Sequence, residues 1–160
     1  EYDNVPTILG RDMSGESDLI NLYSTQILAL ASELPRAGRL EAPDGTATAR
    51  APLCGSTVTV DIATTDGRVS DYAANVKACA LGQAAASVVA HAIIGCTPAE
   101  VTAARDSLRA MLKSNGPAPQ PPFDGLNVLR AAQPFANRHA SILLALDAAV
   151  DALSQVRATA

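Results

Sequence analysis

Two cysteines and one histidine stand out because each falls at the end of an expected helix or strand. Cys54 lies in a turn that contains Pro52 and Gly55. Cys79 opens an alanine-rich segment, and His139 lies near the start of the last expected helix. Thiolate sulfur and imidazole nitrogen are the donors that tetrahedral Zn²⁺ and the iron of sulfide clusters prefer. These three residues therefore predict a metal site.

The expected place of Cys79 at a helix N-terminus favours its reactive form. The partial positive charge there stabilises a thiolate over a thiol, and the thiolate is the form that binds metals or attacks sulfur. The chain has no Cys-x-x-Cys pair that would form a local metal clamp. A second interpretation therefore stays open, in which Cys54 and Cys79 are small buried hydrophobes and His139 is a surface residue.

A third interpretation is an enzyme that uses Cys79 as nucleophile and His139 as its base. The sequence shows no third orienting group, no oxyanion motif and no glycine-rich phosphate loop to go with them. We therefore expect a protein that is not an enzyme.

The elements in the first half of the chain follow from hydrophobic periodicity. Apolar residues at steps of three and four predict a helix from Ser17 to Leu34. Alternation of apolar and polar residues predicts a strand that starts at Thr57, and the Asp66-Gly67 turn predicts a hairpin to a return strand over 68–74. Residues 46–51 are expected to add a third strand.

The second half of the chain predicts helices. An alanine-rich helix is expected from Cys79 to Gly95, and a helix capped by Thr97 follows it. After a proline-rich loop, a short helix is expected over 125–132 and a last helix over 137–152. The order indicates an α+β fold, with a small three-stranded antiparallel sheet packed against about five helices.

Length and composition fit one domain. The chain has 160 residues, of which 48% are hydrophobic, and this is enough for a substantial core. We expect residues 1–16 to form a flexible N-terminal tail and residues 17–155 to form a single domain.

Charge and aromatic content exclude several classes of partner. Aromatic residues make up 3% of the chain, tryptophan is absent and the net charge is −4, so we expect no binding to nucleic acid or to an anionic membrane. No apolar run approaches the roughly 18 residues of a spanning helix. Three cysteines, an odd number, indicate a reducing compartment, and we expect the protein to be cytoplasmic.

Four short segments carry motifs in the same order as one known family. They are Pro52-Leu53-Cys54-Gly55, similar to Pro-x-Cys-Gly-Asp-x-Val; Cys79-Ala80-Leu81, similar to Gly-Cys-Ala-Ile; Gly95-Cys96-Thr97, similar to Gly-Lys-Thr; and His139-Ala140-Ser141-Ile142-Leu143, similar to His-Cys-Ser-Ile-Leu. Together they resemble the IscU/SufU/NifU-type (NifU N-terminal domain-like) iron–sulfur cluster assembly scaffold proteins. The match is collinear over residues 19–153, nearly the whole expected domain.

This resemblance implies a fold and a function. The family's site binds Zn²⁺ or iron, or assembles a [2Fe–2S] cluster, from sulfur that a cysteine desulfurase delivers as persulfide. The cluster then passes to iron–sulfur acceptor proteins. By position, Cys54, Cys79 and His139 match family ligands. Cys54 is the expected sulfur acceptor, because its turn exposes it while the helix half shelters Cys79.

Two positions depart from the family pattern. Ser56 stands where the family has aspartate, and Ala140 stands where it has a third cysteine. Three protein ligands would then leave a fourth position open to water, a thiol or a partner residue. An alternative under the same resemblance is a zinc-binding relative that assembles no cluster.

Four other residues near these motifs carry side chains that bind metals or stabilise thiolates. Cys96 and His91 lie further along the helix that begins at Cys79, and we expect both to lie outside the site. Lys77 and Arg138 are close enough in sequence to Cys79 and His139 to stabilise a thiolate, or they simply face solvent.

Overall fold

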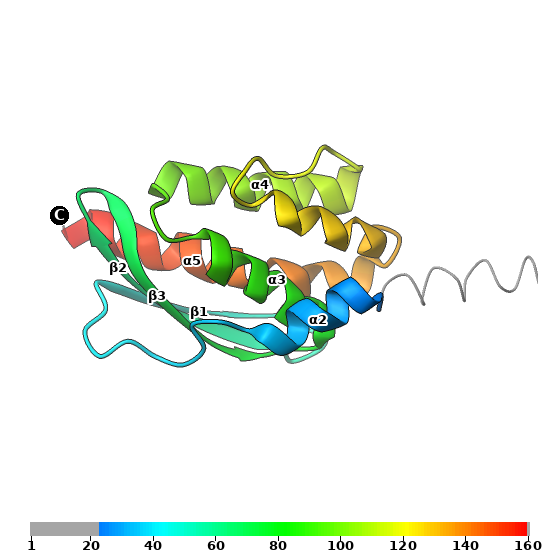
Figure 1. Cartoon of the computed structure of the whole chain (residues 1–160), viewed down its shortest axis with the longest axis horizontal. Coiled ribbons are helices and arrows are strands. Elements are labelled where there is room, and N and C mark those ends of the chain that lie inside the picture. The colour runs from blue at the N-terminus through cyan, green and yellow to red at the C-terminus, as the bar shows by residue number, and fades with distance from the viewer. Residues whose placement is uncertain (1–22, 160) are drawn as a thin grey trace, which may run out of the picture.

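A three-stranded antiparallel sheet, covered on one face by helices, forms the centre of the computed structural model, which describes residues 23–159 (Figure 1). In chain order the elements are α2 (Thr25–Glu33), β1 (Gly45–Arg50), β2 (Thr57–Thr65), β3 (Arg68–Lys77), α3 (Ala80–Ala92), α4 (Pro98–Ser114), the 3₁₀ helices η1 (Asp124–Ala132) and η2 (Ala136–Arg138), and α5 (His139–Thr159). The predicted α+β class is confirmed. The expected tail over residues 1–16 lies outside the described residues.

The sheet has the order β1-β2-β3, with β2 paired antiparallel to both neighbours. Asp66 and Gly67 both have positive φ (54° and 77°), as a two-residue hairpin turn requires, so the predicted hairpin is confirmed. Strand β3 continues past the predicted end at residue 74 to Lys77, which pairs with Thr57. This extra length carries the chain back to the start of β2.

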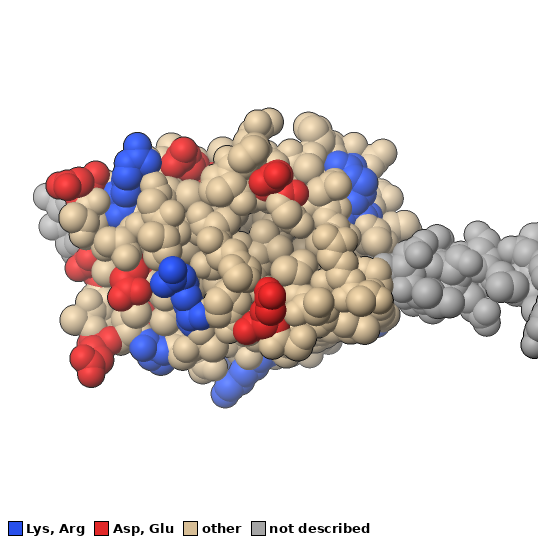
Figure 2. All heavy atoms as spheres, viewed as in Figure 1, with Lys and Arg blue, Asp and Glu red and all other residues tan. Residues whose placement is uncertain are grey.

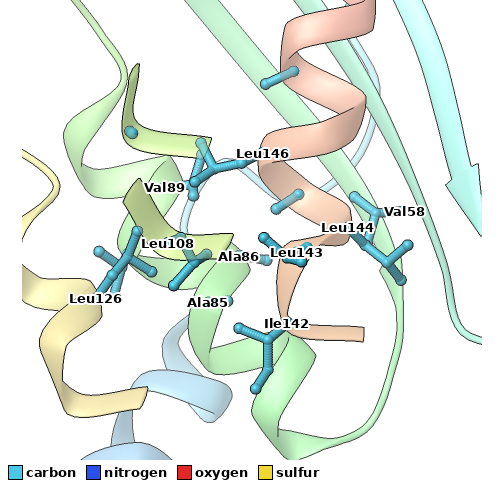
Figure 3. Close-up of a cluster of buried hydrophobic side chains, with 14 of the residues drawn as sticks. Val58, Ala85, Ala86, Val89, Leu108, Leu126, Ile142, Leu143, Leu144 and Leu146 are labelled. Carbon is cyan, nitrogen blue, oxygen red and sulfur yellow. The ribbon is translucent and has the colours of Figure 1, made fainter. Parts of the chain in front are cut away.

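Helices α3 and α5 lie on one face of the sheet, and α4 lies beyond them (Figure 1). Leu144 of α5 points toward Val58 of β2, while Leu146 points toward Val89 of α3 (Figure 3). Helix α5 therefore supplies side chains to both the sheet and the helical layer. The segment 136–156 has the length and hydropathy of a membrane span, but 61% of it is buried inside the domain, as befits a core helix.

The helix predicted from Ser17 to Leu34 does not run unbroken through Ser24. Residues 17–22 lie outside the described residues, but Ser24 is non-helical (ψ 162°) and caps α2, which begins at Thr25. The Ser24 hydroxyl accepts a hydrogen bond from the Ile27 N–H at 3.3 Å. The apolar periodicity crosses this cap without interruption, so it could not mark the boundary.

The later helices match the sequence more closely. Thr97 and Glu100 form the predicted capping box at the start of α4. The short helix near residue 125 is a 3₁₀ helix, η1. The last helix is longer than the predicted 137–152, since α5 starts at His139 and continues to Thr159.

Candidate metal centre

The loops that carry Cys54 and Cys79 lie at the same end of the sheet. Thr57, the first residue of β2, pairs with Arg50 at the end of β1 and with Lys77 at the end of β3. The β1–β2 loop and the β3–α3 junction must therefore leave the sheet side by side. The hairpin register, rather than sequence proximity, brings the two cysteines to one place.

Cys54 is exposed on a closed β1–β2 loop. The Ala51 N–H donates to the Ser56 carbonyl and the Gly55 N–H to the Ala51 carbonyl, both at 2.9 Å, and Gly55 has a φ of 75° that favours glycine. The Cys54 Sγ lies 3.1 Å from the Ser56 Oγ. Hydrogen bonds from the Ser56 hydroxyl and backbone N–H hold the pKa of the Cys54 thiol below its ordinary value.

Cys79 is the N-cap residue of α3 and is half-buried. Its Sγ lies 3.4 Å from the Ser141 Oγ on α5. Burial by itself raises the pKa of the Cys79 thiol, but hydrogen bonds from the Ser141 hydroxyl and from the N–H groups of Gly82 and Leu81 outweigh it, so the pKa is lowered. The positive charge of Arg138 lowers the pKa of this thiol further. The sequence had suggested Lys77 and Arg138 for this role.

The two serines that contact the cysteines also contact each other. The Ser141 hydroxyl donates to the Ser56 Oγ at 3.5 Å, and the two residues are 1% and 6% exposed. Cys54, Ser56, Ser141 and Cys79 thus form one connected row of polar side chains. The structure brings the two predicted cysteine ligands together through this pair of hydroxyls.

His139 lies at the start of α5 and is 3% exposed, so the interpretation that it is a surface residue is wrong. Its Nε2 lies 3.0 Å from the carbonyl oxygens of both Ala132 and Gln133. Since a carbonyl can only accept, Nε2 carries a proton and donates it to them. Nδ1 is buried and has no hydrogen-bond partner among residues 23–159.

This is the state in which metal-binding histidines are commonly held, with one ring nitrogen donating to a backbone carbonyl and the other free. Within residues 23–159, however, no three His, Cys, Asp or Glu side chains gather closely enough to hold a metal ion. The predicted set of Cys54, Cys79 and His139 is therefore not a preformed triad, and its role as a ligand set stays a prediction.

Residues 22–132 match the family described as "NifU-like N terminal domain". The chain belongs to this family. A crystal structure of a nitrogen-fixing NifU-like protein (N-terminal) from Brucella abortus is 45% identical, with a TM-score of 0.87, over 89% of this chain and 99% of that one.

A second crystal structure shares the fold at lower identity. It is the SufU protein of Fervidobacterium islandicum AW-1, described as an iron–sulfur cluster assembly scaffold for the SUF system, with 20% identity, a TM-score of 0.74 and coverage of 84% of this chain and 98% of that one. No curated protein matches the chain. The resemblance found in the motifs is confirmed at the level of the NifU-like family and its fold.

The remaining candidates of this NifU-like domain lie outside the row of polar side chains. Cys96 is 4% exposed beyond the C-terminal end of α3, and its Sγ donates to the Ala92 carbonyl at 3.4 Å. Burial raises the pKa of the Cys96 thiol. His91 is exposed on α3 and its Nε2 contacts the Glu33 carboxylate at 3.0 Å. Their predicted exclusion from the site fits these positions.

Sequence reasoning missed the roles of Ser141 and Gly82. A Cβ built on Gly82 would lie 2.7 Å from the Ser141 Oγ, so only glycine lets α3 and α5 approach closely enough for Ser141 to reach Cys79. Ser141 is part of the last motif, but that motif drew attention to its neighbours His139 and Ala140. A close helix approach depends on packing and leaves no periodic signal in the sequence.

Proposed function

We propose that this NifU-like domain is an iron–sulfur cluster assembly scaffold that accepts sulfur on Cys54 and holds iron, or a [2Fe–2S] cluster, with Cys54, Cys79 and His139. One observation carries the proposal: in a chain of this family, Cys54 and Cys79 converge at one end of the sheet through Ser56 and Ser141. The related SufU protein is itself described as a scaffold for cluster assembly.

Cys54 is the residue proposed to accept sulfur. It is exposed, and hydrogen bonds from Ser56 lower its thiol pKa, so the reactive thiolate is within reach of a second protein. In the transfer, the Cys54 thiolate attacks the outer sulfur of the donor's persulfide. The donor's S–S bond breaks, the donor cysteine leaves as a thiolate, and Cys54 carries the new persulfide.

Cys79 and His139 are the proposed co-ligands of the cargo metal. Cys79 supplies a second soft sulfur, and the unpartnered Nδ1 of His139 is a free imidazole donor in a buried place. Because their side chains do not form a closed site, binding of iron must draw His139 toward the cysteines or leave positions to sulfide and external ligands.

A second candidate function is a holder of Zn²⁺ that assembles no cluster. The observation that favours it is the small donor set, with Ser56 and Ala140 at the positions where the motifs have an aspartate and a third cysteine. We do not propose catalysis by a Cys79–His139 pair, because both groups are hydrogen-bonded elsewhere. The Cys79 Sγ is hydrogen-bonded to the Ser141 hydroxyl, and the His139 Nε2 is hydrogen-bonded to two backbone carbonyls.

The proposed partners are a cysteine desulfurase as sulfur donor and iron–sulfur proteins as cluster acceptors. On the face shown in Figure 2, basic and acidic side chains are scattered and form no basic patch, which fits protein partners better than nucleic acid. All three cysteines are free, which fits work in the reducing cytoplasm.

The proposal is tested by sulfur transfer. The protein is incubated anaerobically with a cysteine desulfurase and cysteine, and persulfide is mapped by mass spectrometry of labelled peptides. We expect one added sulfur atom on Cys54 and none on Cys96, and no transfer to Cys54→Ser. Sulfur on Cys96 alone, or on no cysteine, would contradict the proposed acceptor.

A further inference from the structure

The row formed by Cys54, Ser56, Ser141 and Cys79 contains two buried hydroxyls, those of Ser56 and Ser141. We propose that Ser56 and Ser141 are positioning residues, whose paired hydroxyls hold the two cysteine sulfurs in place and donate hydrogen bonds to them when they bind the cargo metal. This inference rests on the proposed function. The two serine hydroxyls orient the cysteine sulfurs at a site that has few protein ligands.

The contacts support a bridge, because each hydroxyl touches one sulfur and the other hydroxyl. The Ser56 Oγ lies 3.1 Å from the Cys54 Sγ, the Ser141 Oγ lies 3.4 Å from the Cys79 Sγ, and the two oxygens are 3.5 Å apart. Each hydroxyl has one proton to donate. Ser56 can donate to the Cys54 thiolate while Ser141 donates to the Ser56 Oγ, or Ser141 can instead turn its proton toward the Cys79 thiolate.

Burial makes these contacts matter. Ser56 and Ser141 are 6% and 1% exposed, so water cannot readily replace either hydroxyl as a partner of the sulfurs. Cys54, by contrast, lies on an exposed loop. The Ser56–Ser141 contact therefore ties the end of this loop to α5, next to the helix that carries Cys79.

The local fold is also built around Ser141. Its hydroxyl and carbonyl would lie 2.7 and 3.1 Å from a Cβ on Gly82, so α3 has no side chain where Ser141 approaches. This close approach sets the hydroxyl against the N-cap of α3.

The test uses Co²⁺ as a probe of the metal-free full chain, because thiolate-to-cobalt charge-transfer bands report directly on bound sulfur. The variants are Ser56→Ala, Ser141→Ala and the double variant. Ser87→Ala is the matched control, because Ser87 is also fully buried and lies about 12 Å along α3 from Cys79. Its hydroxyl has no hydrogen-bond partner in the part of the chain that the structure describes. Thermal unfolding of each variant verifies that it is folded.

We expect each single site variant to bind Co²⁺ roughly 10- to 100-fold more weakly, as is usual for groups that orient metal ligands. Its charge-transfer band should move to longer wavelength, because a thiolate without its hydrogen bond donates charge more easily. In the double variant, the fold-loss of Co²⁺ affinity should be smaller than the product of the two single fold-losses, since either change breaks the same bridge. Ser87→Ala should match the wild type.

Three results would overturn the inference. Thiolate bands in the wild type that neither serine variant alters would reject the positioning role and leave the proposed function standing. A fold-loss of Co²⁺ affinity in the double variant that equals the product of the two single fold-losses would reject the bridge. A wild-type protein without thiolate bands would reject the proposed metal site, and the inference with it.

Discussion

Gly82 of α3 lies so close to Ser141 of α5 that a Cβ on the glycine would stand 2.7 Å from the serine hydroxyl. This one close approach sets Ser141 against Cys79, and Ser141 in turn reaches Ser56 beside Cys54. The geometry of the candidate site therefore depends on how tightly two helices pack.

Gly82→Ala is expected to separate α3 from α5 locally. The added methyl group meets Ser141 and the Ala78 Cβ, so the unfolding free energy should fall by about 1–3 kcal/mol, as for other overpacked cores. Urea unfolding measures the loss. Gly125→Ala is the control, because its Cβ would meet Val88 at an ordinary 3.4 Å. Equal stability of the two variants would show that the approach is not tight.

The three cysteines are expected to react with iodoacetamide at very different rates. Cys54 is exposed and its thiol pKa is lowered, Cys79 is half-buried, and Cys96 is buried with a raised thiol pKa. The order should be Cys54, then Cys79, then Cys96, as measured by peptide mass mapping at neutral pH. Faster modification of Cys96 than of Cys54 would contradict the described loop.

Asp61 is expected to make the domain sensitive to acid. Burial alone would raise its pKa, but Arg39 at 2.7 Å, the Thr46 hydroxyl and the Leu40 N–H keep the pKa low. The stabilisation is then present above the ordinary carboxyl pKa of about 3.9 and is lost as pH falls through the lower folded value. Asp61→Asn should unfold more easily at pH 7 and lose less further stability on acidification.

The charge of Asp147, in contrast to that of Asp61, is expected to lower the stability of the fold at neutral pH. Burial raises its pKa, and this outweighs the nearby guanidinium groups of Arg105 and Arg109. The folded state then binds this proton more tightly than the unfolded state, so the charge lowers stability above the folded pKa. Asp147→Asn should raise the unfolding free energy at pH 7, and the gain should vanish in acid. A less stable variant at pH 7 would contradict this.

Much of the fold could be predicted from local signals. The alternation after Thr57, the Asp66-Gly67 turn and the Thr97 capping box are each encoded within a few residues, and the structure has all three. The predicted continuous helix from Ser17 to Leu34 was wrong because the apolar pattern runs through Ser24, whereas the extended backbone of Ser24 makes it the N-cap at which α2 begins.

The site was less predictable, because it depends on contacts between distant elements. The motifs pointed to Cys54, Cys79 and His139, yet they gave no sign that His139 is buried with its Nε2 against the carbonyls of residues 132 and 133. The role of Ser141 needed both the register of the sheet and the glycine on α3. Neither leaves a periodic pattern along the chain.

The assembly of a cluster at Cys54 and Cys79 is tested by measuring iron and acid-labile sulfide per chain after anaerobic reconstitution. We predict near-equal iron and sulfide in the wild type and in Cys96→Ser, and their loss in Cys54→Ser and in Cys79→Ser. Zinc without sulfide would favour the zinc-holding alternative. Iron and sulfide that survive in both Cys54→Ser and Cys79→Ser would contradict the account.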